Sequence, residues 1–220
     1  MRRPATITAV LVTASACAAL VILQLNALPQ PAAIAKLIAS GGFLGTAWSV
    51  GALRHPFGRV LFAGLCLSLC GDLFLVGQAR EYFLGGLVSF LLAHVAYTTA
   101  FVSRGQDRRW ALSAALPAVI VALAVLAWLT PHTAPDLLTP VRIYMAAITL
   151  MVITAFGARG AGAPWLLVAG ALLFFVSDLS VALQRLVEID FPTYAWGQPL
   201  YFAGQTCIAL GAKTERQAPR

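Results

Sequence analysis

The chain has 220 residues, of which 60% are hydrophobic and only 10% are charged, and its formal net charge is +7. So few charged side chains cannot cover a soluble surface, which excludes an ordinary soluble domain. The basic residues lie singly or in pairs between apolar runs, which disfavours nucleic-acid binding because that function gathers them into a patch. They are better explained as signals of membrane topology.

Apolar runs separated by turn-forming residues fill the chain from end to end. A bilayer-spanning helix needs roughly 20 apolar residues, and the first run is longer than the roughly 7–15 apolar residues of a signal peptide, so we expect it to be a retained span. We predict an all-α integral membrane protein that forms a single polytopic domain over residues 1–220. Its eight transmembrane helices are expected at 5–27, 32–53, 57–77, 83–104, 110–130, 138–157, 163–184 and 194–212.

The placement of the basic residues predicts the orientation of these spans. With the amino terminus inside, eleven of the 15 basic residues fall in cytoplasmic segments: Arg2, Arg3, Arg54, Arg59, Arg104, Arg108, Arg109, Arg159, Lys213, Arg216 and Arg220. The opposite side has only Arg80 in a loop. Because basic residues favour the cytoplasmic side, we expect both termini in the cytoplasm of a protein of the cell membrane.

Ionisable and polar side chains inside the spans are the strongest functional signal. An ionisable group near the centre of a membrane helix costs at least about 2.5–3.5 kcal/mol, so it is rarely without a role. In chain order the candidates are Lys36, Asp72, His94, Tyr97, Arg142, Tyr144, Asp178, Gln198, Tyr201 and Gln205. Because neighbouring spans run in opposite directions, all of them fall in the outer half or near the middle of the membrane. They predict a polar pocket that opens to the non-cytoplasmic side.

The two halves of the chain share a pattern. In Gly64–Asp72 and in Gly170–Asp178 a glycine precedes an aspartate by eight residues, and the offset between the segments is 106 residues. The same offset aligns the basic residues of the second and sixth spans. We therefore predict two repeats of the same orientation, at about 5–104 and 110–212.

Structural roles are alternatives for the same residues. Asp72 and Asp178 could only neutralise Lys36 and Arg142 and so tie the bundle together, because buried charges pair. A lone His94 is also compatible with a hydrogen bond between helices. No motif indicates a cofactor or a metal, and we predict neither.

Small residues in the spans have structural explanations. Gly41 and Gly45 form a GxxxG pair that predicts close helix packing. The four cysteines lie in apolar runs without metal-ligand spacing and are expected to be buried small hydrophobes: Cys17, Cys66, Cys70 and Cys207.

Four segments together are similar to the YhhN-like membrane proteins, a family that includes the lysoplasmalogenases. They are GLCLSLCGDLFLV at 64–76, GGLVSFLLAHVAYTTAF at 85–101, GALLFFVSDLSVAL at 170–183 and YFAGQTCIALG at 201–211. The resemblance extends from Lys36 to about Gly211. It implies an eight-helix fold and a hydrolase that cleaves the vinyl-ether bond of lysoplasmalogens to a fatty aldehyde and a glycerophospho-headgroup. The implied partners are a lysophospholipid-like substrate and the bilayer.

That chemistry fits the polar residues. One carboxyl, kept protonated by burial, would protonate the alkene carbon, and the other, kept ionised by a basic neighbour, would stabilise the resulting cation or activate water. The catalytic candidates are therefore Asp72, Asp178 and His94, without an assignment of acid and base. The remaining seven residues are candidates for binding the substrate, with Lys36 or Arg142 on its phosphate.

Two other functions are compatible with the sequence. Duplicated halves with intramembrane Asp, Lys and His also describe proton-coupled transporters. Against a transporter, the inner halves of the third and seventh spans, residues 57–65 and 163–172, contain no acidic residue. The other alternative is a lipid-binding protein without catalytic activity, and the oligomeric state is open.

Overall fold

The computed structural model describes residues 3–187 and 189–213, and all regular structure in this part of the chain is helical. Its eight long helices are α1 (Arg3–Leu25), α2 (Pro29–Ser49), α3 (Pro56–Phe74), α4 (Arg80–Ser103), α5 (Arg108–Leu129), α6 (Leu138–Gly160), α7 (Trp165–Ala182) and α8 (Tyr194–Gly211). Three short turns of helix accompany them: η1 (Ala52–Arg54), η2 (Thr130–His132) and η3 (Leu183–Val187).

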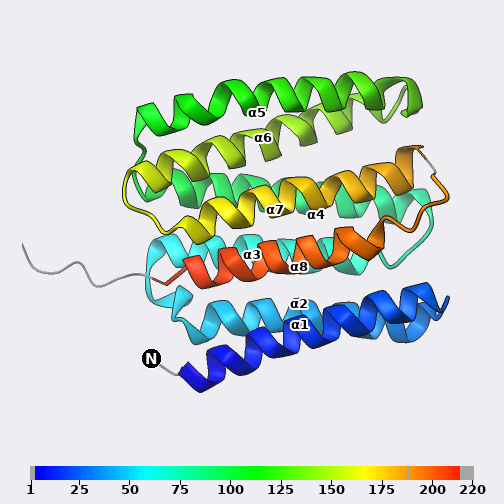
Figure 1. Cartoon of the computed structure of the whole chain (residues 1–220), viewed down its shortest axis with the longest axis horizontal. Coiled ribbons are helices and arrows are strands. Elements are labelled where there is room, and N and C mark those ends of the chain that lie inside the picture. The colour runs from blue at the N-terminus through cyan, green and yellow to red at the C-terminus, as the bar shows by residue number, and fades with distance from the viewer. Residues whose placement is uncertain (1–2, 188, 214–220) are drawn as a thin grey trace, which may run out of the picture.

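Consecutive helices pack against each other as hairpins, α1 with α2, α3 with α4, α5 with α6 and α7 with α8. The hairpins join because α4 also packs against α6, and α8 against α1 and α2. In Figure 1 the α1–α2 hairpin forms one edge of the bundle, the α5–α6 hairpin forms the other, and α3, α4, α7 and α8 lie between them. The start of α1 and the end of α8 lie at the same end of the molecule.

Six helical segments among the described residues are long and apolar enough to cross a membrane, which identifies a multi-pass membrane protein. They comprise α1, α3, α4, α5 with η2, α6, and α7 with η3. The prediction of eight spans is thus confirmed only in part. The helix α2 contains Lys36 and several small or hydroxyl-bearing residues, and α8 has only 18 residues and carries Gln198 and Gln205. These polar groups face the interior of the bundle. They lower the mean hydropathy of α2 and α8, and mean hydropathy is the property by which a membrane span is recognised.

The helix ends lie within a few residues of the predicted ends, and the differences have local causes. The second span was predicted to continue to residue 53, but α2 ends at Ser49 because Gly51 takes a left-handed conformation with φ of 85°. A separate short turn, η1, follows it. In the seventh span, α7 ends at Ala182 and the helix continues as the wider π-helical turn η3.

Two predictions about small residues need correction. A methyl group added at Gly41 would meet nothing within 4 Å, whereas one added at Gly42 would overlap the Thr13 hydroxyl of α1. One added at Gly45 would lie 3.6 Å from the Ala9 methyl group of α1. The contact between α1 and α2 therefore involves Gly45, as predicted, but its closest point is at Gly42 and not at Gly41. Among the cysteines, Cys17 is buried but Cys70 is exposed, because exposure to lipid costs a small apolar side chain nothing.

Candidate active site

A cavity of about 270 Å³ lies between the helices in the half of the molecule that contains the ends of α3 and α7. Its polar lining includes Lys36, Asp72, Tyr144, Asp178, Gln198 and Tyr201. These six residues come from five helices, α2, α3, α6, α7 and α8, and all were candidates from the sequence. The fold therefore brings both intramembrane aspartates to one cavity.

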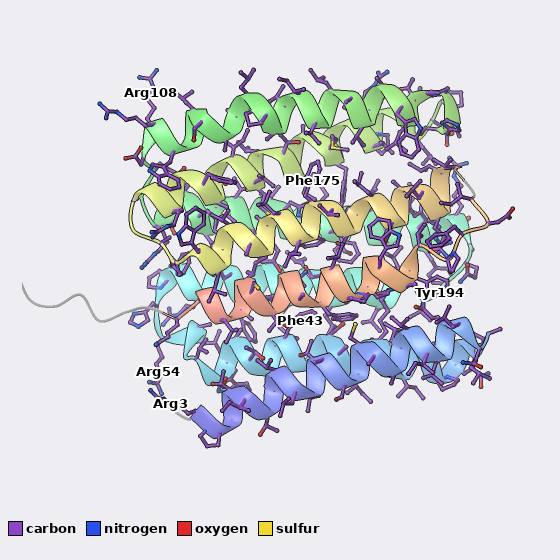
Figure 2. The ribbon with its side chains drawn as sticks, viewed as in Figure 1. Arg3, Phe43, Arg54, Arg108, Phe175 and Tyr194 are labelled. Atoms are coloured by element: carbon purple, nitrogen blue, oxygen red, sulfur yellow. The ribbon has the colours of Figure 1, made fainter. Side chains whose placement is uncertain are left out.

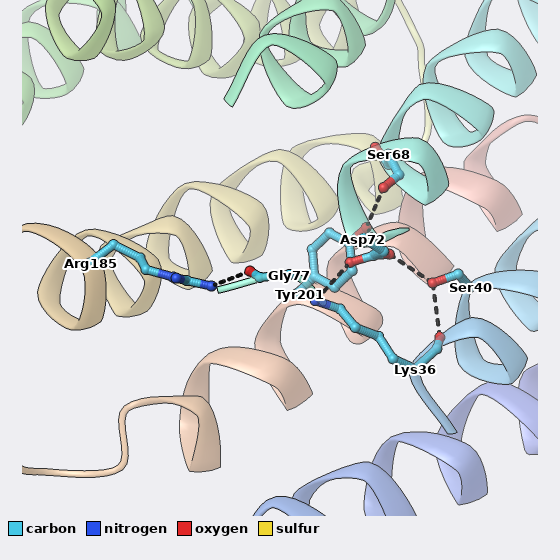
Figure 3. A network of polar contacts seen from close by, with 7 residues as sticks. All are labelled: Lys36, Ser40, Ser68, Asp72, Gly77, Arg185 and Tyr201. Carbon is cyan, nitrogen blue, oxygen red and sulfur yellow. Dashed lines mark hydrogen bonds and ion pairs between the residues drawn. The ribbon is translucent and has the colours of Figure 1, made fainter. Parts of the chain in front are cut away.

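Asp72 is surrounded by hydrogen-bond donors and a cation. Its side chain is only 2% exposed, and its Oδ1 lies 3.4 Å from the Nζ of Lys36. Its Oδ2 accepts a hydrogen bond of 2.7 Å from the Tyr201 hydroxyl and one of 2.7 Å from the Ser40 hydroxyl. Figure 3 shows this network, which joins α2, α3 and α8. An ammonium group and two hydroxyl donors stabilise the ionised form of a buried carboxyl.

Asp178 has different surroundings. Its side chain is 19% exposed, and the closest basic nitrogen is the Nε2 of His94, at 3.5 Å from Oδ2. The same Oδ2 accepts a hydrogen bond of 2.7 Å from the Tyr144 hydroxyl. No Lys or Arg forms an ion pair with Asp178 among the residues that the structure describes. The two carboxyls of the cavity therefore differ in charge compensation as well as in exposure.

His94 lies behind the cavity and is completely buried. Its Nε2 is 3.0 Å from the Tyr144 oxygen, and its ring packs against Phe174 with a centroid distance of 4.7 Å. Because Tyr144 has one proton and gives it to Asp178, the Nε2 of His94 must donate to the Tyr144 oxygen. The chain of groups His94, Tyr144 and Asp178 thus fixes the orientation of the Asp178 carboxyl.

A second polar network lies deeper in the bundle. The Tyr97 hydroxyl donates to the Gln205 side-chain oxygen at 2.8 Å and lies 3.2 Å from the Ser68 oxygen. Tyr97 and Gln205 are both completely buried, and neither lines the cavity. Their contacts join α3, α4 and α8. Tyr97 and Gln205 therefore hold together the helices that carry the site, and they do not line the cavity themselves.

Arg142 is the one sequence candidate that lies away from the others. It is exposed on α6 and does not line the cavity. Among the described residues its guanidinium forms no ion pair with Asp178. The sequence aligned Arg142 with Lys36, which contacts Asp72. In the described part of the structure Arg142 forms no corresponding ion pair with Asp178.

Two residues that the sequence candidates omit belong to the site. Ser40 donates to Asp72, and its position four residues after Lys36 on the same helix face was the available signal. Arg185 lines the cavity from η3, and Figure 3 shows it extending toward Gly77. Its position at a helix end made it resemble a residue of the membrane interface.

Another part of the cavity wall is apolar. The ring of Phe90 lines this part and packs edge-on against Tyr201, with a centroid distance of 5.8 Å. Phe174, which does not line the cavity, packs edge-on against the same Tyr201 ring at 5.3 Å. On the side of the α5–α6 hairpin the wall consists of aliphatic and aromatic side chains, namely Leu129, Val141, Met145, Ile148 and Phe175. No group of three or more His, Cys, Asp or Glu that could hold a metal ion occurs among the described residues. The arrangement suits an amphiphilic organic ligand.

Comparisons with known proteins agree with this architecture. The chain is 34% identical over 171 residues to the lysoplasmalogenase TMEM86A of Bos taurus, an alignment that covers 75% of this chain and 70% of the relative. It is 33% identical over 180 residues to a lysoplasmalogenase of Mycobacterium bovis, which covers 76% of this chain and 67% of the relative. No solved structure matches the chain. The YhhN family model matches residues 31–212, a segment that contains every residue of the cavity lining described above, and the chain belongs to the YhhN family.

Proposed function

We propose that this protein is a membrane-embedded lysoplasmalogenase, a hydrolase that cleaves the vinyl-ether bond of lysoplasmalogen-like lysophospholipids to a fatty aldehyde and a glycerophospho-headgroup. The similarity to proteins named lysoplasmalogenase supports this activity. The observation that carries the chemistry is that two carboxyls with different surroundings line one cavity, Asp72 and Asp178. The apolar part of the same cavity suits the alkenyl chain.

Asp72 takes the role of the carboxylate base in this proposal. Lys36 compensates its charge, and the hydroxyls of Ser40 and Tyr201 donate to it. A carboxylate held in this way is suited to stabilise a neighbouring cation and to take a proton from water. Its partners also keep it in one orientation.

Asp178 is the carboxyl that acts as the general acid. It has no Lys or Arg partner among the described residues, and its side chain is the more exposed of the two carboxyls, at 19% against 2%. Tyr144 donates to Oδ2, which leaves Oδ1 as the oxygen that transfers the proton in this proposal. His94 holds Tyr144 in place through Nε2 and is a positioning residue.

The reaction then needs no group from outside the cavity apart from water. Asp178 gives its proton to the alkene carbon remote from the ether oxygen, and the adjacent carbon becomes an oxocarbenium ion. Water adds to that carbon and loses a proton to Asp72, which yields a neutral hemiacetal. Asp72 then protonates the glycerol oxygen while Asp178 takes the proton of the hemiacetal hydroxyl. The carbon–oxygen bond breaks to give aldehyde and alcohol, and both carboxyls return to their starting states.

The proposed topology has eight spans, with both termini in the cytoplasm of a cell-membrane protein. The basic residues support it, since Figure 2 shows Arg3, Arg54 and Arg108 at one end of the bundle and Tyr194 at the other. An excess of Arg and Lys marks the cytoplasmic end. The α2 and α8 helices count as spans in this proposal because they run alongside the others (Figure 1).

We also propose that the single domain arose from two repeats of four helices, at about 5–104 and 110–212. The contacts of the two aspartates support this. Asp72 contacts α2 of its own half and Tyr201 of α8, and Asp178 contacts Tyr144 of α6, in its own half, and His94 of α4. Each aspartate thus contacts the second helix of its own repeat and the fourth helix of the other.

Release of aldehyde from a lysoplasmalogen by the detergent-purified protein tests the proposed function. We expect release by the unaltered protein and a loss of at least about a hundredfold in kcat for Asp72→Asn and for Asp178→Asn, because each removes an acid–base group. Asp136→Asn is the matched control, since Asp136 is an exposed carboxylate that pairs with Arg80, and it should keep full activity. Full activity in either cavity variant, with folding and membrane insertion intact, would refute the mechanism.

The transporter and the non-catalytic lipid-binding protein are not favoured by the comparisons, because the matched relatives are named for hydrolysis. The same assay separates them from the enzyme. A well-folded protein that releases no aldehyde from several lysoplasmalogens would favour one of these two functions.

A further inference from the structure

The cavity wall has two regions of different chemistry. The apolar region faces the α5–α6 hairpin and is the wall of Leu129, Val141, Met145, Ile148 and Phe175. The polar region is formed by the α1–α2 hairpin, the segment after α3 and η3, and it contains Gln24, Lys36, Gln78, Gln184 and Arg185. A second, more open cavity of about 380 Å³ shares four of these five residues, Gln24, Lys36, Gln78 and Gln184, and continues the polar region along α1 and α2.

Arg185 is the cation of the polar region that is available to a ligand. The other one, Lys36, is paired with Asp72. Arg185 takes part in none of the ion pairs among the described residues. It donates one hydrogen bond, from Nη2 to the Gly77 carbonyl oxygen at 3.2 Å. A guanidinium group has five N–H donors, so most of them remain for an anion.

The local backbone explains why Arg185 faces the cavity. It lies in η3, a turn of π-helix that continues α7. A π-helical turn inserts an extra residue and changes the direction of the side chains that follow, and such turns are frequent at functional sites. The bond to Gly77 then fixes the side chain against the segment that leads to Gln78 (Figure 3).

We infer that Arg185 is the residue that binds the phosphate of the lysophospholipid, with the neighbouring glutamine side chains on the phosphate and glycerol oxygens. The planar guanidinium group matches the geometry of a phosphodiester better than an ammonium group does. The alkenyl chain then lies in the apolar region, and the vinyl-ether bond lies between the two regions, beside Asp72 and Asp178. This inference rests on the proposed function, because it assigns another part of the same substrate.

Binding of two stable ether lipids tests the inference without any turnover. One is a 1-O-alkyl lysophosphocholine, which has the phosphate but no vinyl double bond, and the other is a 1-O-alkylglycerol, which lacks the phosphate. Microscale thermophoresis on the detergent-purified full chain gives the Kd of each. We expect Arg185→Gln to weaken binding of the phospholipid by about ten- to a hundredfold, the usual loss for a charge-assisted hydrogen bond, and to leave alkylglycerol binding unchanged.

Two further variants separate recognition of the phosphate from a structural role. Arg185→Lys keeps the charge without the planar fork, and an intermediate affinity for the phospholipid is expected. Arg80→Gln removes an exposed arginine paired with Asp136 and should bind both lipids normally. If Arg185 only held the Gly77 segment in place, Arg185→Gln would weaken binding of both lipids equally, which would overturn the inference.

The inference and the proposed function fail in different ways. Unchanged preference for the phospholipid in Arg185→Gln, in a protein that still releases aldehyde from lysoplasmalogen, would overturn the inference alone. A preference that depends on Arg185, in a protein that releases no aldehyde, would support the phosphate site and contradict the hydrolase.

Discussion

At the scale of single residues, the buried ion pair of Lys36 and Asp72 connects stability with chemistry. Both side chains are less than 10% exposed, and each charge would be costly to bury without the other. Removing one partner of a buried pair leaves an uncompensated charge, whereas replacing both partners by neutral groups is often tolerated. The pair therefore allows the stability of the fold to be measured separately from its activity.

We predict that Lys36→Met lowers the free energy of unfolding by about 3–5 kcal/mol, because it leaves Asp72 without its cation. The double variant Lys36→Met with Asp72→Asn should recover most of that stability but show no hydrolase activity. Denaturant unfolding in detergent micelles measures the first effect, and aldehyde release measures the second. Lys213→Met, at an exposed position, is the control. A double variant as unstable as the single one would show that the pair is not the cause.

The sequence predicted six polar residues of the cavity wall, but not which side of each helix faces the cavity. Depth in the membrane was sufficient for Asp72, Asp178 and Lys36. For α6 the rotation of the helix decides: Tyr144 lines the cavity, and Arg142, two residues earlier, points about 200° away at about 100° per residue. Arg142 and Tyr144 could therefore not both face one cavity. Their spacing of two residues on one helix was sufficient to predict this. Arg185 was missed because η3 is a change of helix type that no sequence motif signals.

At the scale of helices, glycines decide how closely neighbouring helices approach. A methyl group at Gly170 would lie 2.8 Å from the backbone oxygen of Gly204 on α8, and one at Gly64 would lie 2.5 Å from the ring of Tyr97. The glycine that precedes each aspartate by eight residues therefore lies where a neighbouring helix packs against α3 or α7. The shared sequence pattern has a packing explanation, independent of the chemistry of the aspartates.

We expect Gly170→Ala to destabilise the protein by about 1–3 kcal/mol, because the backbones of α7 and α8 must move apart to accept the methyl group. Gly41→Ala is the matched control in the same kind of helix. Nothing lies within 4 Å of the added methyl group there, so a gain of about 0.5–1 kcal/mol is expected from the better helix propensity of alanine. Thermal unfolding in detergent measures both, and equal effects of the two substitutions would contradict the role of Gly170.

Helix order and approximate helix ends could be predicted from the sequence because apolar length and turn residues determine them locally. The count of spans could not be settled in the same way. Lys36 on α2 and the two glutamines of α8 face neighbouring helices, and hydropathy does not distinguish a polar residue that faces the bundle from one that faces lipid. Which helices pack side by side, such as α4 with α6, depends on long-range contacts that no local pattern contains.

At the scale of the whole molecule, a group of arginines outside the site and the cavity lie at opposite ends of the bundle. Arg3, Arg54 and Arg108 lie at the end from which α1 starts (Figure 2), whereas the polar region of the cavity, with Gln24 and Gln78, lies near the other end. With the basic end in the cytoplasm, the headgroup of the substrate approaches from the non-cytoplasmic side. The cavity of about 270 Å³ is at the small end of ligand sites, which run from about 300 Å³ upward, so it encloses the reacting part of the lipid and not the whole chain.

Single cysteines in a variant that lacks the four native ones test this orientation. Asp136→Cys, in the loop before α6, is expected to react with a membrane-impermeant maleimide in intact cells. Ala161→Cys, in the turn after α6, should react only after the cells are made permeable, because the basic residues place that turn in the cytoplasm. Both positions are exposed. The reverse pattern would invert the orientation and place the opening of the cavity on the cytoplasmic side.

The most direct test of the two-carboxylate mechanism is single-turnover hydrolysis of a lysoplasmalogen in H2O and in D2O, at matched acidity. Transfer of a proton from Asp178 to the alkene carbon as the slow step predicts a rate of aldehyde formation that is clearly lower in D2O, because a deuteron is transferred more slowly than a proton. Equal single-turnover rates in the two solvents would contradict the proton transfer assigned to Asp178.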